Sequence, residues 1–175
     1  MIYFEKGGIK IRNMQESDIR AISDEEIAQG WSDTSEKYKM RIRDQDAGKC
    51  VALAAEFGGK IAGYINVYRN SEYGPFANHG IPEIIDFGVL EKFRRNGIGT
   101  ALMDTAEKIA FSFSDLVCLC VGLHGGYGSA QRMYVKRGFV PDGSGVWYKD
   151  APCKQNEIYR NDDDLVLYFS KRKEV

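Results

Sequence analysis

The residues best suited to chemistry in this sequence are two glycines and two arginines within one short segment. Residues 89–100 read VLEKFRRNGIGT, with Arg94 and Arg95 followed by Gly97 and Gly99. An apolar strand pattern precedes the segment and a helical pattern follows it. Free N–H groups and the positive dipole end of a helix N-terminus bind anions, and glycines let a diphosphate approach closely. Two such glycines also ease a tight turn, so the pair alone leaves both interpretations open.

Two further residues are candidates for proton transfer. Asp86 is an acid inside the otherwise apolar run 83–90, and a buried carboxylate is costly unless it is paired or functional. It is therefore either a base or a structural hydrogen-bonding residue. His124 lies in a glycine-rich loop, where an ordinary pKa near 6.5 suits proton transfer, although a lone loop histidine is often incidental.

Hydrophobic patterns predict the elements that position these residues. Strands are expected at residues 9–12, 50–57, 60–68, 83–90, 116–121, 139–140 and 165–169. Helices are expected from Ser17 or Asp18, as N-cap, to about residue 29, and over 36–46, 97–109 and 129–137. The segment 83–121 is then a βαβ unit with parallel strands. The strand that opens at residues 139–140 is followed by a polar, glycine-containing stretch, 142–164, which leads to the last strand.

Glycines predict where several of these elements end. Gly58-Gly59 is a hairpin signal because a type I′ turn needs two residues with positive φ. Gly138 suits the left-handed position after a helix, and Ser129 is the expected cap at that helix's start.

Composition favours one ordinary globular domain, 1–175. The chain has 175 residues, 43% hydrophobic and 28% charged, with a formal net charge of -1. This length suits one core, and the charge gives no footprint for nucleic acid. No apolar run long enough for a membrane span and no secretory signal are recognised. We expect a cytoplasmic protein without nucleic-acid or membrane partners.

The cysteines do not form a metal-binding pattern. Cys50, Cys118, Cys120 and Cys153 include no C-x-x-C pair, and the two histidines lack ligand spacing. No metal is expected. Cys118 and Cys120 share one face of a strand, where core packing is favoured over a redox role.

Two motifs make the chain resemble the GCN5-related N-acetyltransferase (GNAT) family. The family signature Arg/Gln-x-x-Gly-x-Gly/Ala is matched by Arg94, Gly97 and Gly99. The ending Ala-x-x-x-Tyr-x-x-x-Gly-Phe of a later family helix is matched by residues 130–139. The order of elements also matches from about residue 9 to 170. The resemblance implies an α/β fold, the acyl-CoA N-acyltransferase fold, with a central mixed sheet flanked by helices.

The resemblance also implies acetyl-CoA as co-substrate and a set of donor contacts. The loop would hold the CoA pyrophosphate, and the strand end before it would hold the pantetheine arm and thioester. The expected contacts are Val89, Leu90, Arg94, Arg95, Asn96, Gly97, Ile98, Gly99, Thr100 and Ser129. Many members have an asparagine three residues before the helix alanine, where this chain has Tyr127.

Catalytic roles follow partly from the resemblance and partly from amine chemistry. An amine of pKa near 10 must lose a proton before it attacks a thioester, and the leaving thiolate gains from an acid. Tyr134 resembles the family's general acid. Glu83, eleven residues before Arg94, resembles the glutamate base of histone-type members and is the first candidate, with Asp86 and His124 as alternatives.

The acceptor is expected to be a primary amine on a small molecule or peptide. The family builds its acceptor pocket from the first two helices and two loops, here Trp31, Tyr38, 70–82 and 142–162. The sequence leaves the acceptor undetermined, and a homodimer is possible. Two other readings stay open: a non-catalytic acyl-CoA-binding or sensing module, and a different phosphate binder using the same helix N-terminus.

Overall fold

The computed structural model describes residues 1–174, which divide into two compact units. The first unit comprises Met1–Tyr68 and Ile84–Ile109, and the second comprises Arg69–Glu83 and the described residues from Ala110 on. Strand β5 (Glu83–Val89) begins in the second unit and continues in the first. Each unit is described separately below.

The first unit contains a run of antiparallel strands. In hydrogen-bonded order these are β1 (Ile2–Lys6), β2 (Ile9–Asn13), β3 (Cys50–Phe57), β4 (Lys60–Tyr68) and β5. Gly58 and Gly59 have φ values of 57° and 77°, which confirms the predicted hairpin turn. The sequence pattern did not predict β1, a largely exposed edge strand that depends on its backbone pairing with β2 rather than on burial.

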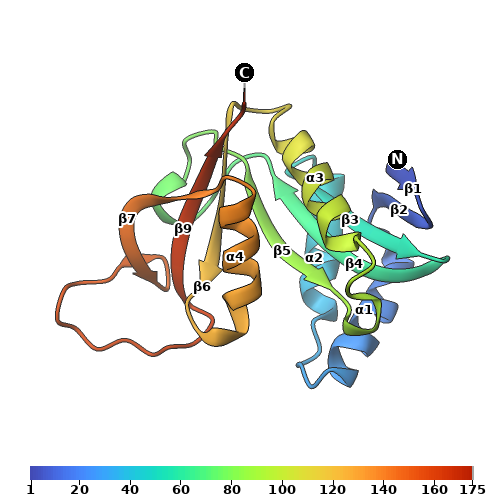
Figure 1. Ribbon diagram of the computed structural model, residues 1–175, viewed down its shortest axis with the longest axis horizontal. Coiled ribbons are helices and arrows are strands. Elements are labelled where there is room, and N and C mark those ends of the chain that lie inside the picture. The colour runs from blue at the N-terminus through green and yellow to red at the C-terminus, as the bar shows by residue number, and fades with distance from the viewer. Residues whose placement is uncertain (175) are drawn as a thin grey trace. The chain divides into compact units, whose positions relative to one another are not determined.

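Helices cover both faces of these strands. Figure 1 shows α3 (Ile98–Ala110) on one face and α1 (Glu16–Ala28) and α2 (Ser35–Asp46) on the other. A core lies under α1 and α2 and includes Met14, Ile19, Ile22, Tyr38, Ile42, Ala52, Tyr64, Tyr68 and Leu90.

The predicted start of α1 is wrong by two residues. Gln15 is the N-cap, and its backbone N–H donates to the Asp18 carboxylate at 2.8 Å. Ser17 and Asp18 lie inside the first turn. Asp18 thus serves as the acidic third residue of a capping box and not as the cap itself.

The second unit contains the rest of the sheet. Its order is β5, β6 (Leu116–Gly122), β9 (Leu165–Arg172), β7 (Val140–Tyr148) and β8 (Ala151–Pro152). Glu83 of β5 pairs with Cys118 of β6 in parallel, which confirms the βαβ prediction, and the other pairs are antiparallel. Helix α4 (Gly128–Lys136) covers one face of β6 and β9 (Figure 1). The fold is therefore a mixed α/β sheet with flanking helices, as predicted.

The structure extends one expected strand in this unit and corrects one expected helix cap. The strand predicted to open at residues 139–140 is β7, and it continues into the polar stretch 142–164, with Gly143 and Gly145 at positive φ where the register shifts. All of β8 also lies in that stretch. Backbone pairing rather than apolar alternation forms that hairpin. Helix α4 begins at Gly128 with Tyr127 as N-cap, so Ser129 lies in its first turn and is not the cap. Gly138 has φ of 86° and fills the left-handed position as predicted.

Candidate functional site

The segment before α3 has the geometry of an anion site. A 3-10 turn at Glu91–Phe93 and positive φ at Arg95 (66°) and Gly97 (80°) lead the chain into the helix. The first helical hydrogen bond runs from Ala101 N to Gly97 O at 3.0 Å. The N–H groups of the first turn therefore have no carbonyl of a preceding turn to bind. They are available to an anion at the helix N-terminus.

Both glycines of the motif are required by the local structure. Gly97 has a left-handed backbone, which L side chains rarely adopt. A Cβ at Gly99 would lie 3.2 Å from the Phe87 ring and 3.5 Å from the Val89 side chain, both on β5. The glycine at position 99 thus lets the first turn of α3 pack against the end of β5.

Polar side chains shape the same turn. The Arg94 guanidinium donates to the Val89 carbonyl at 3.3 Å and pairs with Glu91 at 3.1 Å. The Asn96 amide donates to the Phe93 carbonyl at 3.0 Å. A diphosphate bound at this turn would pair with the Arg94 guanidinium. The Asn96 amide instead stabilises the turn through its own hydrogen bond.

Helix α1 and its C-cap contact this turn through two residues, and the sequence did not suggest either contact. The Gln29 side-chain oxygen accepts the Glu91 N–H at 2.7 Å. Glu25 forms an ion pair with Lys92. No local sequence signal marks these contacts, since about 62 residues separate Gln29 from its partner.

A buried acid lies on the face of the sheet that α1 and α2 cover. Glu26 is fully buried, and its carboxylate accepts hydrogen bonds from Tyr38 (2.8 Å), Tyr64 and Thr34. The Tyr64 ring occupies the space beside Gly88, where a Cβ would lie 2.5 Å from it. Of these residues, Tyr38 was predicted for the acceptor side from the family resemblance, whereas Tyr64 was not predicted.

Asp86 lies two residues further back on β5 in an unusual conformation. Its φ is 52°, a left-handed value inside a strand, which costs on the order of 1–3 kcal/mol for a residue other than glycine. Arg41 Nε donates to Asp86 Oδ2 at 2.7 Å, and Asn66 Nδ2 donates to the same oxygen at 3.0 Å. The predicted pairing of Asp86 is therefore present, with partners from α2 and β4.

Asn66 carries a second unfavourable feature at the same place. Its side chain is fully buried, and its Oδ1 atom has no hydrogen-bond partner within residues 1–174. The amide cannot be turned over, because the Asp86 carboxylate needs the N–H side. An unsatisfied buried acceptor costs about 1–3 kcal/mol.

Glu83 has different surroundings in the second unit. Its buried carboxylate accepts the Ser71 hydroxyl at 2.8 Å. The buried Cys118 thiol nearby has its pKa raised by burial first and by the Glu83 charge second. Glu83 and Asp86 are thus three residues apart in sequence with neighbours of different kinds.

Tyr134 is buried on α4 with its ring against Phe139, the centroids 6.0 Å apart. Burial raises the pKa of its hydroxyl well above the ordinary value, with smaller contributions from Cys120 and Tyr127. The hydroxyl therefore stays protonated at neutral pH and can donate a proton.

His124 has both ring nitrogens engaged. Nε2 lies 2.9 Å from Asp163 Oδ1, and Nδ1 accepts the Gly126 N–H at 3.1 Å. The Tyr127 hydroxyl also donates to Asp163, and these bonds lower the pKa of the Asp163 carboxyl. The Nδ1 lone pair is occupied, so the arrangement supports a structural role for His124 between two loops.

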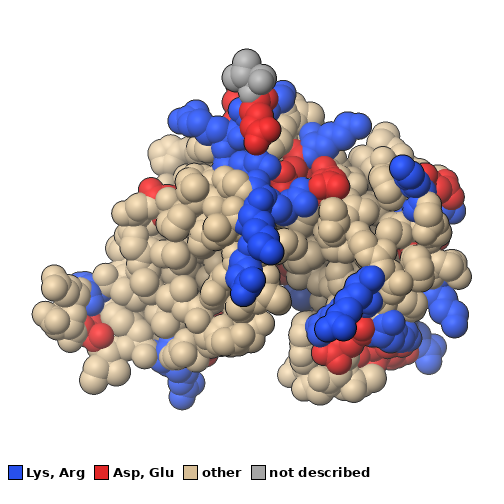
Figure 2. All heavy atoms as spheres, in the orientation of Figure 1, with Lys and Arg blue, Asp and Glu red and all other residues tan. Residues whose placement is uncertain are grey.

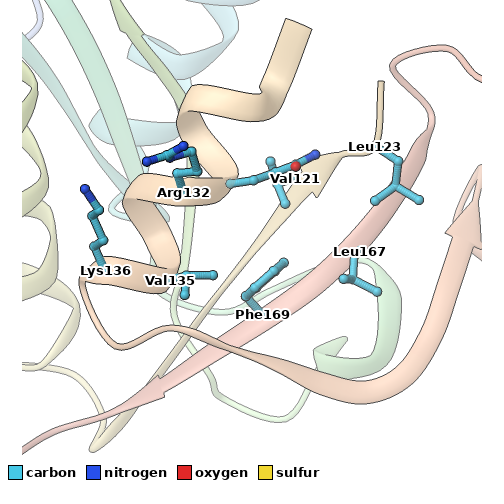
Figure 3. Close-up of a pocket in the computed structure, with 8 residues that line it drawn as sticks. Val121, Leu123, Arg132, Val135, Lys136, Leu167 and Phe169 are labelled. Atoms are coloured by element: carbon cyan, nitrogen blue, oxygen red, sulfur yellow. The ribbon is translucent and has the colours of Figure 1, made fainter. Parts of the chain in front are cut away.

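Helix α4 also borders a cavity of about 420 Å³ in the second unit. Val135 of α4 and Leu167 and Phe169 of β9 line it, while Arg132 and Lys136 extend on the side away from Leu167 (Figure 3). Lys and Arg side chains form a stripe along α4 (Figure 2). Arg132 and Lys136 are solvent-exposed, as expected for a helix surface.

The structure thus groups the predicted residues by unit. The first unit holds Asp86 and the expected donor contacts from Val89 to Thr100, and the second holds Glu83, His124, Ser129 and Tyr134. Within residues 1–174 no cluster of His, Cys, Asp or Glu could hold a metal ion. No helix in this part of the chain is long and apolar enough to cross a membrane.

The motif, the fold and the helix N-terminus agree with comparison to known families. Residues 16–139 match the model of the acetyltransferase (GNAT) family, and the chain belongs to this family. No curated protein matches the sequence.

Solved structures share the fold over nearly the whole chain. Ard1 from Thermoplasma volcanium is 21% identical with a TM-score of 0.68, covering 95% of this chain and 98% of that one. A Salmonella typhimurium acetyltransferase that modifies the N-terminal serine of ribosomal protein L7/L12 is 12% identical with a TM-score of 0.73, covering 99% and 100%. The yncA protein from Salmonella typhimurium, solved with its cofactor acetyl-CoA, is 14% identical with a TM-score of 0.67, covering 95% and 94%.

Proposed function

We propose that this protein transfers an acetyl group from acetyl-CoA to a primary amine of a small molecule or peptide. The observation that carries the proposal is the N-terminus of α3, where Gly97 and Gly99 open the first turn to a diphosphate beside the end of β5. Family membership supports acetyl transfer, and the acetyl-CoA in the yncA structure supports the donor.

The donor would bind along the first unit. The pyrophosphate lies against the N–H groups from Gly97 to Thr100, with Arg94 and Arg95 adding positive charge. The pantetheine arm follows the backbone at Val89 and Leu90. Ile98 and Asn96 shape this turn, and Ser129 would contribute from the first turn of α4.

The chemistry needs one group to take a proton and one to give one. The amine nitrogen attacks the thioester carbonyl, the C–S bond breaks, and the CoA thiolate takes a proton from Tyr134. The raised pKa of Tyr134 supports this role because the phenol stays protonated. Asp86 is our preferred base over Glu83, because Asp86 Oδ1 has no hydrogen bond within residues 1–174, while Glu83 is buried against Ser71.

Both units would act as one acetyltransferase domain. The family match at residues 16–139 includes parts of each unit. Structures with this fold include an enzyme that modifies a protein N-terminus, which supports testing peptides as well as small amines.

The test is CoA binding by calorimetry and acetyl-CoA turnover with a panel of amines. Gly99→Glu should abolish CoA binding, because it places bulk and negative charge at the helix N-terminus. Gly99→Ala is the matched control: it shares the 3.2 Å approach to Phe87 without the charge, and it should bind more weakly than the wild type but measurably. Folded Gly99→Glu protein with unchanged affinity would refute the donor site.

The second candidate function is a non-catalytic acyl-CoA-binding module. It predicts that CoA binds with the same Gly99 dependence, while no amine in the panel accelerates thiol release. The measured release rate therefore decides between the two functions.

A further inference from the structure

Two unfavourable features meet between β4 and β5, and neither is needed for the sheet to form. Asp86 has a left-handed backbone within a strand, and the buried Asn66 opposite it has an unsatisfied Oδ1. Backbone strain and orphaned buried acceptors persist only where other interactions compensate for them, and they cluster at functional sites. The two features share one hydrogen bond, from Asn66 Nδ2 to Asp86 Oδ2.

The left-handed φ changes where the Asp86 side chain points. In a regular strand, neighbouring side chains alternate between faces. Here Ile85 packs against the core under α1 and α2, and Asp86 reaches Arg41 of α2 on that same side. The strand conformation thus brings the carboxylate to the face where the Tyr64 ring covers Gly88.

Only one oxygen of the Asp86 carboxylate is used by the protein. Oδ2 accepts from both Arg41 and Asn66, and within residues 1–174 no hydrogen bond reaches Oδ1. The side chain is 17% exposed and that of Arg41 is 16% exposed. The carboxylate is therefore fixed through one oxygen and accessible at the other.

Arg41 is itself held in place. Its Nη1 donates to the Tyr68 hydroxyl at 2.9 Å, its guanidinium lies 5.2 Å from the Tyr68 ring centroid, and that hydroxyl donates to Asp44. These contacts limit the guanidinium to one orientation. A carboxylate bound to a fixed donor loses little further freedom when it acts in catalysis.

We propose that Arg41 and Asn66 are positioning residues, which hold Asp86 Oδ2 so that Oδ1 faces the amine during acetyl transfer. This inference rests on the proposed function. Asn66 keeps its unsatisfied Oδ1 because the amide is the group that can donate to Asp86 from the centre of β4. Arg41 prevents the carboxylate from turning through its hydrogen bond to Oδ2.

Several titratable and charged groups face Asp86. They come from α2, β3 and β4, and they are Arg41, Asp44, Cys50, Tyr64 and Tyr68. Burial raises the pKa of the Cys50 thiol to about 11 and raises the pKa values of both tyrosines further. The thiol and both phenols therefore stay protonated at neutral pH, and Arg41 supplies the positive charge beside Asp86.

The first test replaces Asn66 with leucine, which has similar volume and no polar atoms. Asn66→Leu removes the orphaned acceptor, so the melting temperature should stay equal or rise. The loss of one positioning contact should lower kcat/KM for the amine on the order of 100-fold, with KM for acetyl-CoA unchanged. A lower melting temperature with wild-type kcat/KM per folded molecule would show that Asn66 is merely structural and would overturn the proposal.

The second test compares two variants of Arg41 with a control. Arg41→Gln should lower kcat/KM for the amine and leave KM for acetyl-CoA unchanged, because Asp86 Oδ2 loses the donor that fixes it. Arg41→Lys keeps a donor and should recover part of kcat/KM. Arg12→Gln removes another arginine bound to partly buried acids, Asp18 and Glu56, and should lower stability while leaving kcat/KM per folded molecule unchanged.

The outcomes separate this inference from the proposed function. Wild-type protein that binds CoA but transfers acetyl to no amine in the panel contradicts the function. Active wild-type protein with unchanged kcat/KM in Arg41→Gln and Asn66→Leu contradicts only the positioning role.

Discussion

Glu83 and Asp86 lie on one strand, three residues apart, but their carboxylates have different surroundings. Glu83 is buried in the second unit and accepts the hydroxyl of Ser71. Asp86, in the first unit, is bound by the guanidinium of Arg41 and retains a free oxygen. The first environment encloses the acid, and the second orients it.

The comparison shows that the sequence position of an acid in an apolar strand does not by itself determine whether its carboxylate is enclosed or accessible. A buried carboxylate that accepts a hydroxyl, as Glu83 does from Ser71, suits a group that stabilises a local structure such as the turn-rich loop that contains Ser71. A paired carboxylate with one accessible oxygen suits proton transfer, because a base must first reach its proton. Three predictions test this contrast.

The largest effect is expected for Asp86→Asn. The amide keeps an oxygen for Arg41 but cannot take a proton, so kcat/KM for the amine should fall by about 100-fold or more. Glu83→Gln should change it by no more than a few-fold. Steady-state kinetics against pH, with CoA affinity as the folding control, measures both. A larger loss in Glu83→Gln would reverse the ranking of the two acids.

A smaller effect is expected for Tyr134→Phe. The single-turnover rate should fall on the order of 100-fold, because the proposed acid is lost. Phenylalanine keeps the ring packing against Phe139. The Kd for acetyl-CoA should hardly change. Because burial raises the pKa of Tyr134, the wild-type rate should not fall with rising pH until above about pH 10, the ordinary value for tyrosine. Equal single-turnover rates would make Tyr134 a packing residue, and weaker binding at an equal rate would make it a donor contact.

The smallest effect is expected for His124→Gln. The Nδ1 lone pair of His124 already accepts the Gly126 N–H, so the ring has no site left for a substrate proton. Steady-state kinetics should show a change in kcat/KM of less than about threefold. A much larger loss in His124→Gln would place the base in the second unit and remove the contrast between the two acids.

The turn before α3 could be predicted from sequence because its determinants are local. Gly97 and Gly99 meet backbone requirements within a few residues, and the helical spacing after them places the two glycines at a helix start. The hairpin at Gly58 and the left-handed Gly138 were predictable for the same reason. Only the opening of β7 was predicted, because backbone pairing with β9, and not its own glycine-containing sequence, extends it to Tyr148.

The acceptor side could not be predicted, because its contacts join distant segments. Asp86 was recognised as unusual, but its partners are 45 and 20 residues away on α2 and β4. Neither Arg41 nor Asn66 carries a local pattern that marks it.

The sequence by itself therefore determined the family, the order of most elements and the glycine turn before α3, all of which depend on short-range backbone geometry. Only the tertiary structure decided which acid has a free oxygen, which histidine nitrogen is occupied, and that Asn66 faces Asp86 with an unsatisfied oxygen. The physical reason is that hydrogen bonding and burial belong to pairs of groups brought together by packing. The same aspartate in the same strand would be enclosed or accessible according to the residues that fold against it.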